Sequence, residues 1–166
     1  MNGADDMKLW VCLCFCLMLI TSGCRASVGN FHDDSLNMTV LSDVIDEKIS
    51  AKEWNIDPLL ESYSIQEAEM LYGIEDSFCE EVLIRRALSD AACEEIVIVH
   101  AKDQHQKDIM KQFQTYQQDR AAAFARLVNQ QAMVQQAITV NYGNYVIFVC
   151  SKDQTNVLQY MRSLSA

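Results

Sequence analysis

Residues 137–150 read AITVNYGNYVIFVC, in which two runs of strand-forming residues flank Gly143-Asn144. A two-residue connection with glycine in first place is typical of a tight hairpin turn. The stretch therefore predicts two antiparallel strands, residues 137–142 and 145–150.

The predicted register gives the second strand two apolar faces. Tyr142 and Tyr145 share one face, while Val146 and Phe148 lie on the other. A sheet covered on one side only would leave Val146 and Phe148 in water. Either the terminal helices of the domain cover this second face, or it is a surface for a partner or a second copy of the chain. The candidate interaction residues are therefore Tyr142, Tyr145, Val146 and Phe148.

A second hairpin is predicted upstream of the first. Residues 81–88 and 94–101 have strand-forming composition and are joined by four residues, Ser-Asp-Ala-Ala. If this turn sets the register, Arg86 lies opposite Glu95 on the neighbouring strand.

Helical segments surround the two hairpins. Apolar spacing and helix-forming composition predict helices over residues 39–52, 65–72, 104–128 and 153–164, with a break near Asn129. These segments predict an α+β domain in the order helix, short helix, hairpin, long helix, hairpin, helix. Its four strands are expected to form one antiparallel sheet.

The N-terminus predicts a secreted protein. Residues 9–20 form an uncharged apolar run of 12, which follows Lys8 and is too short to cross a membrane, since a span needs about 20 residues. The run ends in Thr-Ser-Gly-Cys24, which resembles the lipobox of bacterial lipoproteins. The resemblance implies cleavage before Cys24 and a diacylglyceryl, palmitate-type anchor on its thiol. We expect a signal peptide over residues 1–23, a flexible tether over 24–38 and one globular domain over 39–166.

The charge of the chain bears on its partners. Among 166 residues, 13 are Lys or Arg and 23 are Asp or Glu, which gives a formal net charge of −10. Nucleic acid is excluded as a partner, because its binding depends on basic side chains that neutralise phosphates. An acidic domain is also not attracted to anionic lipid. We therefore expect the lipid on Cys24 to hold the protein at the extracytoplasmic face of the cell membrane.

No cofactor or metal site is predicted. After cleavage and lipidation of Cys24, the remaining thiols are those of Cys79, Cys93 and Cys150. None of these belongs to a C-x-x-C pair, so they are expected to be small and buried. His100 and His105 are interpreted as a surface junction between a strand and a helix, although a ligand pair is the alternative.

Three segments resemble a family of bacterial lipoproteins known as domain of unknown function 4358. They are residues 71–74 (LYGI), 94–103 (EEIVIVHAKD) and 143–153 (GNYVIFVCSKD), and the similarity extends over roughly residues 40–160. The resemblance implies a lipid-anchored protein with a single domain. It implies no catalytic residue.

Two classes of function remain open. The first is a non-catalytic binding or assembly module. Four tyrosines would give such a module an amphipathic contact surface, although tyrosines are also ordinary residues at the rim of a core. The four are Tyr72, Tyr116, Tyr142 and Tyr145. The alternative is a hydrolase or carbohydrate-active enzyme that uses a pair of carboxylates. Neither the doublet Glu80-Glu81 nor Glu94-Glu95 is expected to be such a pair, since neighbours on a strand point to opposite faces. Both doublets are predicted to be solvated.

Overall fold

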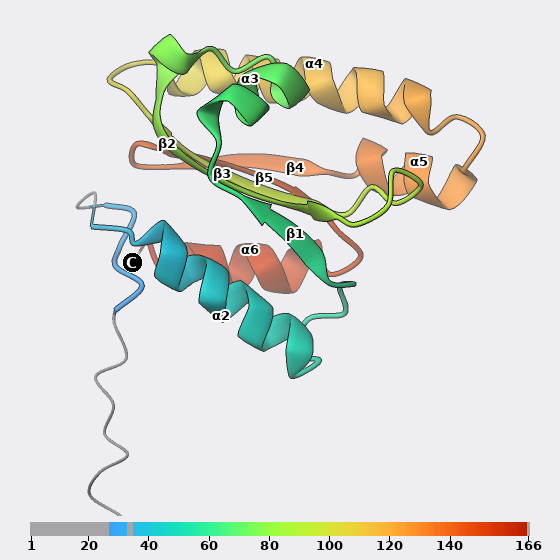
Figure 1. Ribbon diagram of the computed structural model, residues 1–166, viewed down its shortest axis with the longest axis horizontal. Helices are drawn as coiled ribbons and strands as arrows, with labels where there is room; N and C mark the ends of the chain where they lie inside the picture. Colours follow the sequence, from blue (N-terminus) through green and yellow to red (C-terminus); the bar gives the residue numbers. More distant parts are fainter. Residues whose placement is uncertain (1–26, 33–34, 166) are drawn as a thin grey trace, which may run out of the picture.

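A computed structural model of the chain describes residues 27–32 and 35–165. The predicted signal peptide and Cys24 lie outside these residues. The described chain has three layers, with one antiparallel sheet between two layers of helices (Figure 1). None of the helices in this part is both long enough and apolar enough to cross a bilayer.

The sheet has five strands in the order β1-β2-β3-β5-β4, and every neighbouring pair is antiparallel. The strands are β1 (Leu59–Ser62), β2 (Cys79–Ala87), β3 (Glu95–Ala101), β4 (Ile138–Tyr142) and β5 (Tyr145–Cys150). The helices are α2 (Met38–Ser50), α3 (Ile65–Tyr72), α4 (Gln106–Ala123), α5 (Val128–Gln135) and α6 (Gln154–Ser163), with a 3-10 turn at Asp76–Phe78.

Both predicted hairpins are present. Tyr142 pairs with Tyr145 across the β4–β5 turn, and Arg86 pairs with Glu95 across β2 and β3, as the turn lengths predict. Gly143 has a φ of +56°, and a Cβ at this position would lie 2.5 Å from the carbonyl oxygen of Phe31. Glycine is therefore needed both for the turn and for the close approach of the N-terminal segment.

The mixed α+β class is confirmed, but the prediction of four strands is wrong. Residues Leu59–Ser62 form a fifth strand, β1, which pairs with the edge of β2. This segment has only four residues and shows no alternation of apolar and polar side chains, so its strand conformation depends on the neighbour with which it pairs. The break in the long helical segment also comes earlier than predicted, at residues 124–127, and Asn129 lies inside α5.

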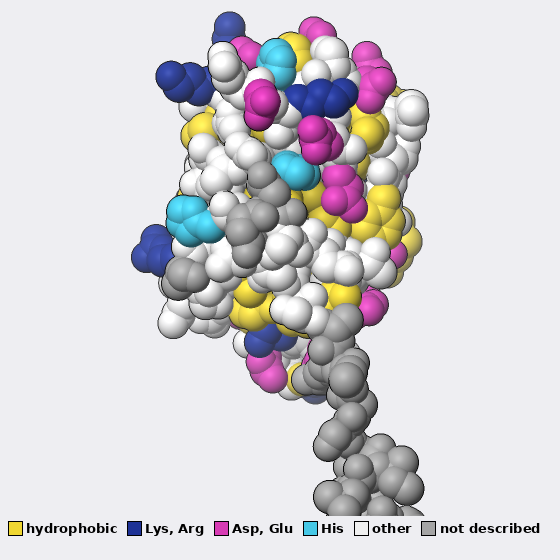
Figure 2. All heavy atoms as spheres, turned by 90° about the vertical axis from the view of Figure 1, so that its left-hand side faces the viewer, with side chains coloured by type: hydrophobic (Ala, Val, Ile, Leu, Met, Phe, Trp, Pro, Cys, Tyr) yellow, Lys and Arg dark blue, Asp and Glu magenta, His cyan; other side chains and the backbone are white. Residues whose placement is uncertain are grey.

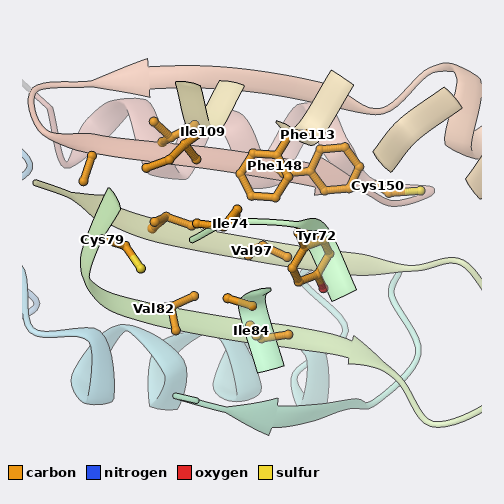
Figure 3. Packing of buried hydrophobic residues seen from close by; sticks show 14 of the residues in the cluster. Tyr72, Ile74, Cys79, Val82, Ile84, Val97, Ile109, Phe113, Phe148 and Cys150 are labelled. Atoms are coloured by element: carbon orange, nitrogen blue, oxygen red, sulfur yellow. The ribbon is translucent and has the colours of Figure 1, made fainter. Parts of the chain in front are cut away.

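Both faces of the sheet are covered by helices. Figure 1 shows α3 and α4 on one side, here called the α3/α4 face, and α2 and α6 on the other, the α2/α6 face. On the α3/α4 face, Phe148 stacks on Phe113 of α4 with ring centroids 5.2 Å apart (Figure 3). On the α2/α6 face, Ile147 and Val149 belong to the same cluster as Val157 of α6. Helices of the same domain therefore bury both sides of β5.

Part of the segment that we expected to be a tether packs on the domain. Phe31 is fully buried, its ring lies 5.2 Å from that of Tyr145, and its backbone N–H donates to the carbonyl of Leu164. Leu36 is also buried. The described part of the segment therefore anchors the start of α2 to the end of α6.

The surface carries charges of both signs. At the end of the molecule viewed in Figure 2, acidic and basic side chains are interspersed, with apolar patches between them. This view shows no continuous basic surface, which agrees with the excess of acidic residues in the sequence.

Candidate functional site

A row of three side chains crosses the α3/α4 face of the sheet. Arg86 of β2 pairs with Glu95 of β3, and Glu95 pairs with Cys150 of β5. Paired residues lie on the same face of a sheet, so the row brings a cation, a carboxyl group and a thiol together. Glu95 is only 3% exposed, which is unusual for a carboxylate without a contacting cation.

Two tyrosines bind the carboxyl group of Glu95. The Tyr116 hydroxyl donates to Oε1 at 2.8 Å and lies 3.0 Å from Oε2, and the Tyr72 hydroxyl donates to Oε2 at 3.0 Å. The two rings meet edge to face, with centroids 4.7 Å apart. Tyr72 ends α3 and Tyr116 lies in the middle of α4, so the carboxyl group of Glu95 joins both helices to the sheet.

Burial dominates the electrostatics of this cluster. It raises the pKa of Glu95, while the hydrogen bond from Tyr116 and the positive charge of Arg120 act in the opposite direction. Burial, followed by the negative charge of Glu95, also raises the pKa of Tyr72 and of Tyr116. Both hydroxyls therefore stay protonated at neutral pH and serve as hydrogen-bond donors.

A groove of about 390 Å³ lies over this cluster, between α3 and α4. Tyr72 and Tyr116 line it together with Gly73 and residues of α4, of which Gln112, Thr115, Asp119 and Arg120 are polar. A concave surface with aromatic and convergent polar groups beside perturbed pKa values is the usual mark of a binding site.

Larger hollows lie beside α2, with volumes of about 640 and 710 Å³. The carboxylates that line them, such as Asp43, Glu53 and Asp57, are exposed. The smaller groove is therefore the better candidate, because it lies against a buried carboxyl group.

Two of the three cysteines in the part of the chain that the structure describes meet at the Cys150 end of the row. All three thiols are buried, as predicted, but the Sγ atoms of Cys93 and Cys150 lie 3.7 Å apart. Cys79 pairs with Ala101 at the other end of β3. The sequence prediction did not bring Cys93 and Cys150 together.

The residues predicted to form an interaction surface lie inside the domain. Tyr145, Val146 and Phe148 are 1%, 0% and 0% exposed, so of the two alternatives the covered face is the one observed. The helices that cover Val146 and Phe148 are α3 and α4, not the terminal helices α2 and α6. Tyr142 is half-buried against Phe31. These four residues are core or rim of the core.

The expectation that Glu94 and Glu95 are solvated is also wrong, since each is only 3% exposed. Glu95 faces the two tyrosines, whereas Glu94 lies near Lys152, with 3.6 Å between Oε2 and Nζ. The side chains of Glu94 and Glu95 point to opposite sides of the sheet, so the two residues do not form a carboxylate pair.

The two histidines take part in ring stacking. His100 stacks on Tyr145 at 4.4 Å, and His105 stacks on Phe78 at 4.6 Å. Within residues 27–32 and 35–165, no group of three or more His, Cys, Asp or Glu side chains is arranged to hold a metal ion.

The sequence prediction already named Tyr72 and Tyr116 among four candidate contact tyrosines, but only the predicted pairing of Arg86 with Glu95 concerned the carboxyl group itself. It placed both residues on one face, although nothing in the local pattern showed that two helices would cover Glu95. The tyrosines are 23 and 21 residues away from Glu95 in the sequence, so only tertiary packing brings them to it.

One family model matches the chain over residues 52–151, and it is described as a domain of unknown function (DUF4358). The matched region covers more than half of the chain and contains all five strands, α3, α4 and α5, and hence the candidate site. No curated protein and no solved structure matches the chain.

Proposed function

The chain belongs to the family of domain of unknown function DUF4358, and we propose that it is a lipid-anchored binding or assembly module on the extracytoplasmic side of a bacterial membrane. Its ligand or partner would be a protein or a component of the cell envelope, and its contact site would be the groove between α3 and α4.

The hydrogen bonding of Glu95 is the observation that carries the non-catalytic part of the proposal. Both oxygens of its carboxyl group accept bonds from Tyr72 or Tyr116. A general acid or base must come within hydrogen-bond reach of the substrate, whereas Glu95 is 3% exposed and is not itself among the residues that line the groove. Glu95 therefore fits the role of holding two aromatic side chains in place beneath the groove.

The groove has the composition of a contact surface. Its aromatic floor is fixed by Glu95, and its rim offers an amide at Gln112, a hydroxyl at Thr115 and a cation at Arg120. Rigid tyrosines with adaptable polar neighbours bind partners at a low cost in conformational entropy.

The alternative, a hydrolase with a carboxylate pair, is supported by one feature of the same groove. Asp119 lines it, above the buried Glu95. For catalysis, Glu95 would have to leave both tyrosines, which would expose a cluster that now satisfies its own hydrogen bonds.

The sequence supports the membrane anchor, and the fold is compatible with it. Phe31, which follows Cys24 closely in the sequence, is already buried in the domain, so an anchor on Cys24 would hold the domain near the bilayer. The acidic net charge makes the lipid necessary for attachment.

Cell fractionation of a Cys24→Ala variant tests the anchor. We expect the wild-type chain in the membrane fraction with the mass of a diacylglyceryl-modified Cys24, and the variant either in the medium or as an unprocessed precursor. The control is Cys16→Ala, which changes a cysteine inside the apolar run and should leave both fraction and mass of the mature chain unchanged. If Cys24→Ala behaves like the wild type, the lipoprotein proposal is wrong.

Photocrosslinking in cells tests the groove. A benzophenone amino acid at Gln112, in the wall of the groove, should give a discrete adduct that is absent when the same group replaces the exposed Thr155 of α6. Equal adducts at both positions, or none at Gln112, would contradict a binding role for the groove.

A further inference from the structure

Cys93 and Cys150 come from distant parts of the sequence and meet at one end of the sheet. Cys93 lies two residues before β3, and Cys150 is the last residue of β5, the strand next to β3. The Cys150 thiol donates to the Sγ of Cys93 at 3.7 Å. Both side chains are essentially inaccessible, with exposures of 1% and 0%.

The two thiols have different surroundings. The backbone N–H of Cys93 donates to Oε1 of Gln130 at 2.9 Å, and its thiol points to the carbonyl of the same residue at 3.5 Å. The hydrogen bond from Cys150 lowers the pKa of the Cys93 thiol, whereas the same bond and burial raise the pKa of Cys150. Of the two thiols, Cys93 is therefore the one that ionises more readily.

The connection that precedes Cys93 is exposed, although the thiol of Cys93 is buried. The connection from β2 to β3 is mostly exposed at residues 88–91, and Leu88 is 66% exposed. Local opening of such a connection costs less than global unfolding, and it would give a reagent a route to Cys93 that leaves the sheet intact.

We propose that Cys93 and Cys150 are the site of an intramolecular disulfide that links the start of β3 to the end of β5. The oxidant is another disulfide, either of a small thiol compound or of a thiol–disulfide oxidoreductase. The formation of this bond in the cell rests on the proposed extracytoplasmic location, because disulfides persist in oxidising compartments.

The exchange proceeds in two balanced steps. The Cys93 thiolate attacks one sulfur of the oxidant, the sulfur–sulfur bond of the oxidant breaks, and one thiolate leaves with its electron pair. Cys150 then loses its proton and attacks the Sγ of Cys93, which expels the second thiolate. The two protein thiols are oxidised, and the oxidant disulfide is reduced to two thiols.

Thiol counting and peptide mapping test this site in the full chain. The protein tested is the full chain in mild detergent. It carries four substitutions, Cys12→Ser, Cys14→Ser, Cys16→Ser and Cys24→Ser, which leave three thiols. After incubation of the reduced protein with oxidised glutathione, we expect one titratable thiol, that of Cys79. Trypsin should release residues 87–102 joined to residues 127–152, while residues 53–85 carry an alkylated Cys79. Tm should rise by roughly 10 °C.

Two single variants give matched controls. Cys79→Ser should keep the joined peptides and leave no titratable thiol. Cys93→Ser should abolish the joined peptides and the rise in Tm. If three thiols persist after oxidation, or if Cys79 enters the cross-link in place of Cys150, the proposed pair is wrong.

The outcomes separate this proposal from the proposed function. Failure of the joined peptides to form with oxidised glutathione overturns the disulfide wherever the protein resides. If the joined peptides form but the wild-type chain is absent from the membrane fraction, the anchor proposal fails and the disulfide site stands.

Discussion

Adjacent residues of β2 and β3 are divided between the two faces of the sheet, and each face holds a buried charged group that belongs to a strand. On the α2/α6 face, Arg85 is 2% exposed and contacts Asp46, Glu61 and the hydroxyl of Ser42. On the α3/α4 face, Glu95 accepts hydrogen bonds from two neutral tyrosine hydroxyls.

The difference lies in how each charge is compensated. Arg85 forms ion pairs with two carboxylates at the rim and also donates to the carbonyl of Leu59 at 3.3 Å, so it attaches both α2 and the edge strand β1 to β2. Glu95 has only neutral donors in contact, and Arg120 influences it without a direct bond. The first cluster therefore stabilises the fold, whereas the second retains an unneutralised carboxyl group under a groove.

The largest expected effect comes from a charge placed in the α3/α4 core. Phe148→Asp should prevent stable folding, with a loss of more than about 5 kcal/mol, because a carboxylate would replace a ring stacked on Phe113. Circular dichroism and light scattering measure this. Asn141→Asp, at an exposed position of the neighbouring strand, is the control and should change stability by less than about 0.5 kcal/mol. A folded Phe148→Asp monomer would show that this face is not core.

The next effect compares the neighbours Arg85 and Arg86. Arg85→Met should cost about 3 kcal/mol of unfolding free energy, because it leaves Asp46, Glu61 and the Leu59 carbonyl without their cation. Arg86→Met, on the other face and only half-buried, should cost about 1 kcal/mol or less. Urea denaturation of both variants gives the difference. Equal losses would contradict the division of roles between the faces.

A smaller effect should appear in the pH dependence of Glu95→Gln. The folded-state pKa of Glu95 is raised above its ordinary value of 4.5 by burial, so between pH 4.5 and the raised pKa the folded protein binds more protons than the unfolded chain. Wild-type stability therefore falls as pH rises through this window. The free energy of unfolding of Glu95→Gln, relative to that of the wild type, should therefore increase as the pH rises from acidic to neutral values. Denaturation at a series of pH values measures this, and a constant difference would contradict it.

The smallest effect is the opposite trend for Glu61→Gln. The hydrogen bond from Ser42, together with the charge of Arg85, lowers the pKa of Glu61 in the folded state. Its stabilisation is present above the ordinary value of 4.5 and is lost as pH falls through the lowered pKa. Because the side chain is 39% exposed, the loss at neutral pH should be below about 1 kcal/mol, and it should vanish in acid. A variant that is less stable than the wild type by the same amount at every pH would disagree with this assignment.

Several elements follow from local sequence alone. The β4–β5 hairpin depends on Gly143 at the turn, and α3 begins with the Ser64 cap and ends at Gly73 in the left-handed conformation, both of which are short-range features. The pairing of Arg86 with Glu95 follows from the length of the connection between β2 and β3. Such features involve neighbours a few residues apart, so sequence patterns report them directly.

Tertiary structure decided the rest. The strand β1 exists because β2 has a free edge, and Val146 and Phe148 are core because α3 and α4 cover their face. The Glu95–tyrosine cluster and the Cys93–Cys150 contact likewise join segments that are 21 to 57 residues apart. The physical reason is that burial and hydrogen bonding depend on which helices and strands pack together. The packing of these elements minimises the exposed apolar surface of the whole domain, so no local stretch of sequence determines it.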